Sequence, residues 1–152
     1  MHAQGFIFPS AARKQVFSKD FLSKNFSHLN PSQGGYPDMG SGYYAQKLSH
    51  GDWLKINNAQ RAHYNFLEAF PSFVVFTLVC GLVYPKLALW CGVVNFVGRI
   101  LYAIGYVKSG AKGRYVGALV TDFALIASFG GAVAGMFSAG GGVSGITSAL
   151  LK

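Results

Sequence analysis

Acidic residues are the scarcest charged residues in this 152-residue chain, which holds five Asp or Glu against 13 Lys or Arg. Charged residues make up only 12% of the sequence, about half the usual share of a globular protein. So few charges cannot coat the surface of an ordinary soluble domain. Hydrophobic residues make up 51%, and so apolar a chain would collapse in water, which excludes disorder for most of it. An integral membrane protein is the class that remains.

Cysteine and the motifs of common catalytic sites are also scarce or missing. Cys80 and Cys91 both lie inside apolar runs, which favours buried, inert thiols over a disulfide or a reactive pair. Zinc-ligand spacing, HExxH, GxSxG and the P-loop do not occur. The net charge of +8 is spread over loops and is not gathered in a nucleic-acid-binding motif. We therefore predict no metal site, no nucleic-acid partner and no nucleophile supplied by the chain.

Apolar stretches, in contrast, are long, and each is close to the roughly 20 residues that a helix needs to cross a bilayer. They cover about residues 66–84, 87–107 and 115–137. Pro85 disfavours helical geometry in Tyr84, so a turn is predicted at residues 84–86, and a small basic loop is predicted at residues 108–114. The predicted fold class is all-α, an antiparallel bundle of three transmembrane helices. The alternative, buried core helices of a soluble protein, would leave no polar helix to face water.

Composition divides the chain into three segments. They are a polar N-terminal segment and cytosolic loop (residues 1–56), the helix bundle (57–138) and a glycine-rich tail (139–152). Within the first segment, the apolar patch at residues 5–8 is broken by Pro9 and is too short for a spanning helix. Residues 31–43, rich in Gly, Pro and Ser, are predicted to form a loop.

Basic residues are concentrated in the loops at one end of the predicted bundle. That end carries ten of them, whereas the other end carries Lys86 and Lys152. By the positive-inside rule, the richer end faces the cytoplasm.

Glycines recur at a spacing of four residues near the end of the last stretch. Gly131 and Gly135 form a GxxxG pair, and Gly141 and Gly145 repeat the spacing. Small faces let helices approach closely in lipid, so Gly131 and Gly135 predict a helix contact or oligomer packing. The glycines at 140–142 favour a loose tail.

Polar residues inside the apolar stretches need an explanation, because they are costly in lipid. They are Arg61, Asn65 and Glu68 at the first stretch, Asn95, Arg99, Tyr102 and Tyr106 in the second, and Asp122 in the third. In the first two stretches the spacing places them on one helix face. One interpretation is a buried seam that fixes helix register, in which Arg99 pairs with Glu68 or Asp122 and Arg61 pairs with Glu68. We prefer it for Arg99 and Asp122 alone.

The second interpretation is an anionic, peptide-like ligand held at the membrane face. The cations Arg61 and Arg114 would bind its carboxylates, and Asn65 and Glu68 would take an amide and an ammonium group. The two tyrosines of the second stretch would add hydroxyl donors and ring surface. Excess basic charge suits a ligand with net negative charge. His63 lies off this stripe and is interpreted as a surface or helix-contact histidine, not a catalytic base.

Three segments resemble motifs of the MAPEG family, the membrane-associated proteins of eicosanoid and glutathione metabolism. They are Asn-Asn-Ala-Gln-Arg-Ala-His-Tyr-Asn-Phe-Leu-Glu at residues 57–68 with Pro71 following, Gly-Arg-Ile-Leu-Tyr-Ala-Ile-Gly-Tyr at residues 98–106, and Ala-Arg-Lys at residues 12–14. The first motif is quite specific, and the resemblance covers about residues 12–137. Within the family, the chain is most similar to the third-type microsomal glutathione transferases, with the cysteinyl-leukotriene synthases as relatives.

The resemblance implies a four-helix protomer that assembles as a homotrimer, with glutathione between neighbouring protomers near the cytosolic face. It implies glutathione contacts at Arg61, Asn65, Glu68, Tyr102 and Tyr106 and, with a short loop shift, at Arg114. Arg13 matches a basic site residue. Lys14 lies where the leukotriene synthases have an arginine that activates the thiol. A lysine can stabilise a thiolate as a point charge but lacks the guanidinium fork.

Two departures from the family pattern qualify these expectations. Ala69 replaces the tyrosine that follows the glutamate in leukotriene synthases, which disfavours that activity. Only 12 residues precede Arg13, too few to cross about 30 Å of hydrocarbon at about 1.5 Å per residue. We therefore expect either a truncated or alternative gene product or a family member without the first spanning helix.

The resemblance implies a membrane-bound glutathione transferase that conjugates glutathione to lipophilic electrophiles, with peroxidase activity toward lipid hydroperoxides as a second activity. Its expected partners are membrane lipid, the electrophile or hydroperoxide, and two further copies of the chain. The endoplasmic reticulum is the first expectation for its membrane and the mitochondrial outer membrane the second. A non-catalytic binding or scaffold protein of the same fold and a structural subunit of a membrane complex are the alternatives.

Overall fold

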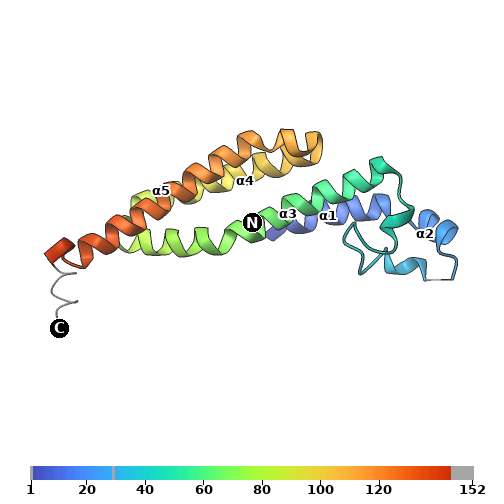
Figure 1. Ribbon diagram of the computed structural model, residues 1–152, viewed down its shortest axis with the longest axis horizontal. Helices are drawn as coiled ribbons and strands as arrows, with labels where there is room; N and C mark the ends of the chain where they lie inside the picture. Colours follow the sequence, from blue (N-terminus) through green and yellow to red (C-terminus); the bar gives the residue numbers. More distant parts are fainter. Residues whose placement is uncertain (1, 29, 145–152) are drawn as a thin grey trace. The chain divides into compact units, whose positions relative to one another are not determined.

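The computed structural model describes residues 2–28 and 30–144 of the chain, and within these ranges it is all-helical, as predicted (Figure 1). The helices are α1 (His2–Val16), α2 (Lys19–Asn25), α3 (His50–Val83), α4 (Pro85–Gly113) and α5 (Tyr115–Ala139), with short 3-10 helices at Pro31–Gln33 and Ala45–Lys47. The chain forms two compact units. The first unit comprises residues 1–66 and 100–115, and the second unit comprises residues 67–99 and 116–152.

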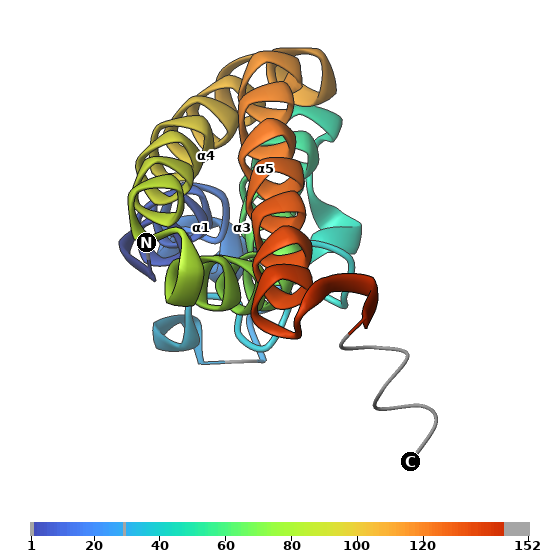
Figure 2. The same ribbon diagram turned by 90° about the vertical axis from the view of Figure 1, so that its left-hand side faces the viewer.

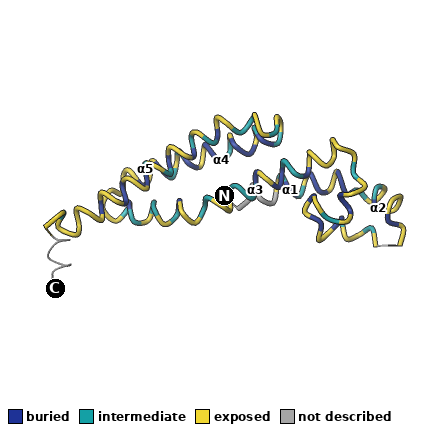
Figure 3. Tube along the Cα trace, viewed as in Figure 1, coloured by how far each residue is buried: buried dark blue, intermediate teal, exposed yellow. Residues whose placement is uncertain are grey.

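Helices α3, α4 and α5 are each long and apolar enough to cross a membrane, which confirms the three predicted apolar spans. In the second unit, many of their large apolar residues are exposed (Figure 3). The most exposed of them include Leu78, Leu82, Leu89, Trp90, Phe123 and Ile126. A soluble helix would turn such side chains inward, so this pattern favours a lipid environment over water.

Small residues form the inward face of α5 in the second unit. They are Gly117, Thr121, Ala124, Ser128, Gly131, Ala132 and Gly135. The hydroxyls of Thr121 and Ser128 donate to backbone carbonyls within the helix, each at 2.9 Å, so neither is left without a partner. Figures 1 and 2 show α5 side by side with the parts of α3 and α4 that belong to this unit.

The GxxxG pair lies at a close helix contact, as predicted. A Cβ atom added to Gly131 would lie 2.5 Å from the sulfur of Cys80, and one added to Gly135 would lie 3.1 Å from a methyl group of Val83. Cys80 and Cys91 are both buried free thiols, which agrees with the expectation from sequence. Gly145 lies outside the described residues.

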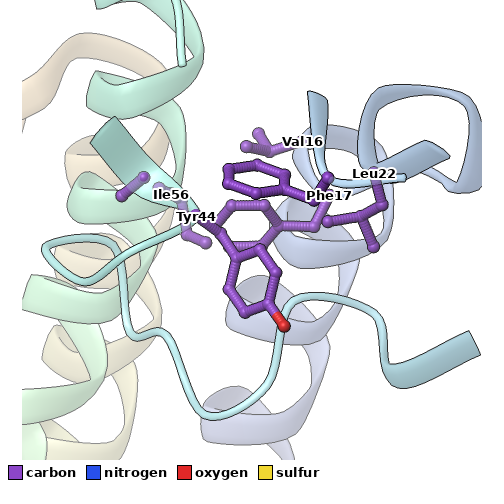
Figure 4. Packing of buried hydrophobic residues seen from close by; sticks show 7 residues of the cluster. Val16, Phe17, Leu22, Tyr44 and Ile56 are labelled. Carbon is purple, nitrogen blue, oxygen red and sulfur yellow. The ribbon is translucent and has the colours of Figure 1, made fainter. Parts of the chain in front are cut away.

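The first unit has an aromatic core that fastens the N-terminal helices to the start of α3 (Figure 4). Its buried members are Val16, Phe17, Leu22, Phe26, Tyr44, Ala45 and Ile56. The rings of Phe26 and Tyr44 meet edge to face with centroids 5.1 Å apart. Burial of each large side chain contributes about 1.5–3 kcal/mol, so this cluster fixes the loop that precedes α3.

Helix α3 begins at His50, well before the apolar stretch that revealed it. Ser49 caps this end: its Oγ accepts from the backbone N–H of Asp52 (3.1 Å) and donates to the Asp52 carboxylate (2.7 Å). The predicted apolar stretch covers only the part of this helix that can enter lipid. The predicted domain boundary at residue 57 lies within this helix, and the three-segment division stays a prediction.

The connections between the long helices differ in part from those predicted. The break at Tyr84 is confirmed, and Pro85 is the first residue of α4, a position that tolerates its missing N–H. The predicted basic loop at residues 108–114 is instead helical through Gly113, apart from a break at Gly110. Residues 31–43 are turns and one 3-10 turn, as predicted, whereas α1 continues through Pro9.

Candidate functional site

Two tyrosines, four residues apart on α4, form the centre of the candidate site in the first unit. Tyr102 is 3% exposed and Tyr106 is 8% exposed, and their ring centroids are 5.7 Å apart. Residues at i and i+4 lie on the same face of a helix, so both rings point to the same side of α4, as the spacing predicted.

The side chain of Arg114 lies against both tyrosines. The carbon of its guanidinium is 5.7 Å from the centroid of the Tyr106 ring, within the range of a cation–π interaction. A hydrogen bond with the Tyr102 side chain is the main cause that raises the pKa of Arg114 above its ordinary value. The guanidinium is therefore a permanent cation next to two phenol groups.

Three glycines bring Arg114 back to these tyrosines. Gly110 has φ 62° and ψ −148°, a conformation that is essentially open to glycine alone, and it breaks α4. After this break, Gly113 packs on Gly105: a Cβ atom on either residue would collide with the carbonyl oxygen of the other. The close approach of these two backbones turns the chain so that Arg114 lies beside the face of α4 that carries Tyr102 and Tyr106.

The same turn touches α3 within the first unit. An ideal Cβ atom on Gly110 would lie 3.6 Å from Nδ2 of Asn58, which lies one turn before Arg61. Arg61 is exposed and Asn65 is half-buried, and both belong to this unit. Glu68 is exposed on the same helix but belongs to the second unit.

Two buried polar atoms on α3 were not identified from the sequence as parts of a site. The Oε1 atom of Gln60, a residue only 3% exposed, and the Nδ1 atom of His63 have no hydrogen-bond partner among the described residues. Leaving a buried acceptor unpaired costs about 1–3 kcal/mol, so a ligand that supplies a donor would be favoured there. His63 is half-buried, and its ring lies 6.2 Å from that of Tyr64, in keeping with a helix-contact histidine.

Arg13 is buried and hydrogen-bonded to the backbone, whereas a cation that acts on a substrate would be open to it. Arg13 is 5% exposed, and its guanidinium donates to the carbonyl oxygen of Asp38 and, at 3.5 Å, to that of Gly34. The guanidinium also lies 4.0 Å from the centroid of the Tyr36 ring. These contacts fasten the loop before α3 to the last turn of α1.

The side chain of Asp38 organises the same loop. Its carboxylate accepts from the backbone N–H groups of Gly40 (2.7 Å), Gly42 (2.8 Å) and Ala45 (2.7 Å). Burial alone would raise the pKa of Asp38, but these backbone donors together outweigh it and hold the pKa below its ordinary value. Apart from the position of Asp38 in a glycine-rich segment, no sequence pattern indicates this role.

Lys14 is exposed at a cavity of about 490 Å³ in the first unit, which we call the basic cleft. The cleft is lined by Ser10, Arg13, Lys14, Phe17, Ser18, Lys19, Pro31, Ser32, Gln33, Gly34 and Tyr36. The structure thus places Arg13 and Lys14 in the lining of the basic cleft. It brings Tyr102, Tyr106 and Arg114 together as a separate cluster that does not line this cleft.

The remaining polar residues of the apolar stretches lie in the second unit. Asn95 and Arg99 are buried on α4, whereas Asp122 is exposed on α5. The pairing of Arg99 with Glu68 or Asp122 stays a prediction. Among the residues that the structure describes, no three His, Cys, Asp or Glu side chains gather closely enough to hold a metal ion.

Comparison with protein families gives one match that spans most of the chain. The model of the MAPEG family matches residues 24–134. This range contains the Tyr102–Tyr106–Arg114 group and the α3 residues Arg61, Asn65 and Glu68. Arg13 and Lys14 precede it.

Proposed function

Because the chain belongs to the MAPEG family, we propose that it binds glutathione and conjugates it to lipophilic electrophiles within a membrane. The contact of Arg114 with Tyr102 and Tyr106 is the observation that carries this proposal. Glutathione is a tripeptide with two carboxylates and net negative charge. A cation beside two tyrosine side chains offers a carboxylate one ionic contact and hydroxyl groups that can donate hydrogen bonds.

The residues on α3 complete the proposed contacts. Arg61 would pair with the second carboxylate, and Asn65 would bond a peptide amide. The unpaired oxygen of Gln60 is an acceptor that an N–H group of the ligand could satisfy. The role of Glu68, as the partner of the ligand's ammonium group, rests on the family resemblance alone.

The chain's cations would activate the thiol of glutathione. A free thiol has a pKa near 8.5, and the thiolate is the reactive form, so nearby positive charges favour reaction by lowering that pKa. Lys14 is the candidate from the resemblance, and its exposed ammonium group is free to move toward a ligand, whereas Arg13 is held by backbone carbonyls. The thiolate sulfur forms a bond to the electrophilic carbon, and the leaving group departs with the electron pair of the bond that breaks.

The lipophilic nature of the second substrate follows from the outward apolar side chains of α3, α4 and α5. A molecule dissolved in the bilayer would reach these helices directly. The same proposal includes reduction of a lipid hydroperoxide by two glutathione molecules, which yields the alcohol, water and glutathione disulfide. It also includes a homotrimer in the endoplasmic reticulum or the mitochondrial outer membrane.

The test uses full-length protein purified in detergent, with glutathione and either an aryl halide or a lipid hydroperoxide. We expect product formation above the protein-free rate. We expect Arg61→Ala and Glu68→Ala to weaken glutathione binding much more than Asp122→Asn, which removes an exposed charge of the second unit. Rates equal to the protein-free control, in a sample that is folded and trimeric, would refute the transferase and peroxidase proposals.

A non-catalytic binding protein is the second candidate, and the engagement of Arg13 favours it. A cation fastened to Asp38 and Gly34 stabilises the loop and cannot also approach a thiol. Calorimetry separates the two candidates. Glutathione binding without turnover would support a binding protein, and turnover that Lys14→Ala lowers with little change in KM would support an enzyme.

A further inference from the structure

The basic cleft has more positive charge than the proposed transferase uses, because Lys14 has a role there and Lys19 has none. The ammonium groups of Lys14 and Lys19 are exposed at its mouth, and the guanidinium of Arg13 is buried in its wall. Among the described residues that line the cleft there is no Asp or Glu. Asp38 is near Arg13, but its carboxylate is taken up by three backbone N–H groups. The charge of the cleft is therefore not neutralised from within.

Hydroxyl groups surround these cations. Ser10, Ser18 and Ser32 line the cleft together with the lysines. Ser18 accepts from the backbone N–H of Phe21 at 3.2 Å, which leaves its own hydroxyl proton to donate into the cleft. The Ser32 hydroxyl already donates to Oδ1 of Asn30 at 2.7 Å. Ser10 and Ser18 are therefore the hydroxyl donors of the cleft. Two ammonium groups and two hydroxyl donors in one cavity suit a group with multiple negative charge and several acceptor oxygens, a description that a phosphate monoester meets better than a single carboxylate.

The size of the cleft indicates that a phosphate would be part of a larger group. Its volume of about 490 Å³ falls within the range of about 300–1,000 Å³ that is typical of small-molecule sites. Tyr36 and Phe17 add ring surface to the wall. A chain with three helices suited to crossing a membrane lies next to the headgroups of anionic lipids, and basic residues near a membrane surface attract them.

We propose that the basic cleft binds a phosphate monoester, presented by the headgroup of an anionic phospholipid such as a phosphoinositide. This site lies in the N-terminal part of the chain and does not include Tyr102, Tyr106 or Arg114. The two proposals share Lys14, whereas Lys19 has no part in the proposed transferase and tests the phosphate site separately.

The experiment titrates dioctanoyl phosphatidylinositol 4-phosphate into the full-length protein in neutral detergent and measures binding by thermophoresis. Dioctanoyl phosphatidylcholine and inorganic phosphate are the comparison ligands. Lys19→Ala removes one cation of the cleft. Lys24→Ala is the matched control, because it removes an exposed lysine from the same helix, α2, that does not line the cleft. Lys14→Ala combined with Lys19→Ala removes both exposed cations.

We expect Lys19→Ala to weaken phosphoinositide binding about fivefold and the double variant about 25-fold, as for one ionic contact per lysine near a membrane surface. Lys24→Ala should bind like the wild type, and phosphatidylcholine should not bind. Competition by inorganic phosphate at similar affinity would identify free phosphate as an equal source of the ligand. Much tighter binding of the lipid would identify the headgroup.

Three results would overturn the proposal. They are no phosphoinositide binding by the wild type, equal binding by the wild type and the double variant, and displacement of the lipid by glutathione. Glutathione binding is measured on the same samples by calorimetry, and Lys19→Ala should leave it unchanged. The failure of the phosphate site is thus separable from the failure of the proposed transferase.

Discussion

The contact between Gly105 and Gly113 predicts that a single added methyl group displaces Arg114. In Gly105→Ala, the new Cβ atom would overlap the carbonyl oxygen of Gly113, and because that atom belongs to the backbone, no side-chain rotation can relieve the overlap. The turn must open. Inserting a methyl group into a tight contact costs about 1–3 kcal/mol of folding free energy.

The effect on ligand binding should be comparable in free energy to the effect on the fold. Opening the turn moves Arg114 away from Tyr102 and Tyr106, which removes a charge-assisted contact to a glutathione carboxylate. Such contacts contribute about 1.5–3 kcal/mol, so glutathione binding should weaken by about 10-fold to 150-fold. Gly92→Ala is the matched control: the substitution is the same, on the same helix, and the added Cβ atom meets nothing within 4 Å.

Calorimetric titration with glutathione and thermal unfolding in detergent measure the two effects. Equal glutathione affinity for Gly105→Ala and Gly92→Ala would show that the backbone contact does not position Arg114, and would refute this reasoning. If Gly105→Ala does not fold, Arg114→Lys tests the same idea, because it keeps the backbone and the charge but loses the guanidinium fork.

Three further predictions address the fold and the site. Asp38→Asn should lower the free energy of unfolding by about 1.5–3 kcal/mol at pH 7. Because the pKa of Asp38 in the folded protein lies below its ordinary value, the wild type should lose this stability as the pH falls below about 4. Chemical denaturation of the variant should show no such loss. Gly131→Ala should lower thermal stability, because its Cβ atom would meet the sulfur of Cys80 at 2.5 Å, whereas Gly130→Ala, with nothing within 4 Å, should not; equal melting curves would contradict the packing. Tyr102→Phe should weaken glutathione binding about fivefold to tenfold by calorimetry, as for one lost hydrogen bond, and an unchanged affinity would remove its hydroxyl from the site.

The long helices and their neighbours could be predicted because their signals are local in sequence. Apolar length marks the three spans, Pro85 marks the break after Tyr84, and spacing by four places Tyr102 beside Tyr106. The start of α3 at His50 was missed because residues 50–65 are polar, although Ser49 and Asp52 form a recognisable cap.

Other features depend on contacts between distant residues, which no local pattern encodes. Arg13 donates to the carbonyl oxygens of Gly34 and Asp38, which lie 21 and 25 residues further along the chain, and its catalytic role stays a prediction. The helical turn at residues 108–114 was read as a loop because Gly110 and Gly113 are poor helix formers. Their role is conformational, since Gly110 adopts a left-handed φ and Gly113 allows a backbone contact.

The central claim is that Arg114, with Tyr102 and Tyr106, holds an acidic thiol tripeptide. The most direct test is calorimetric titration of glutathione into the wild type, Arg114→Ala and Lys112→Ala, the last of which removes an exposed cation from the same turn. The account predicts saturable binding by the wild type and by Lys112→Ala, and at least tenfold weaker binding by Arg114→Ala. Equal affinity of all three proteins, or no binding by a folded, trimeric wild type, would contradict it.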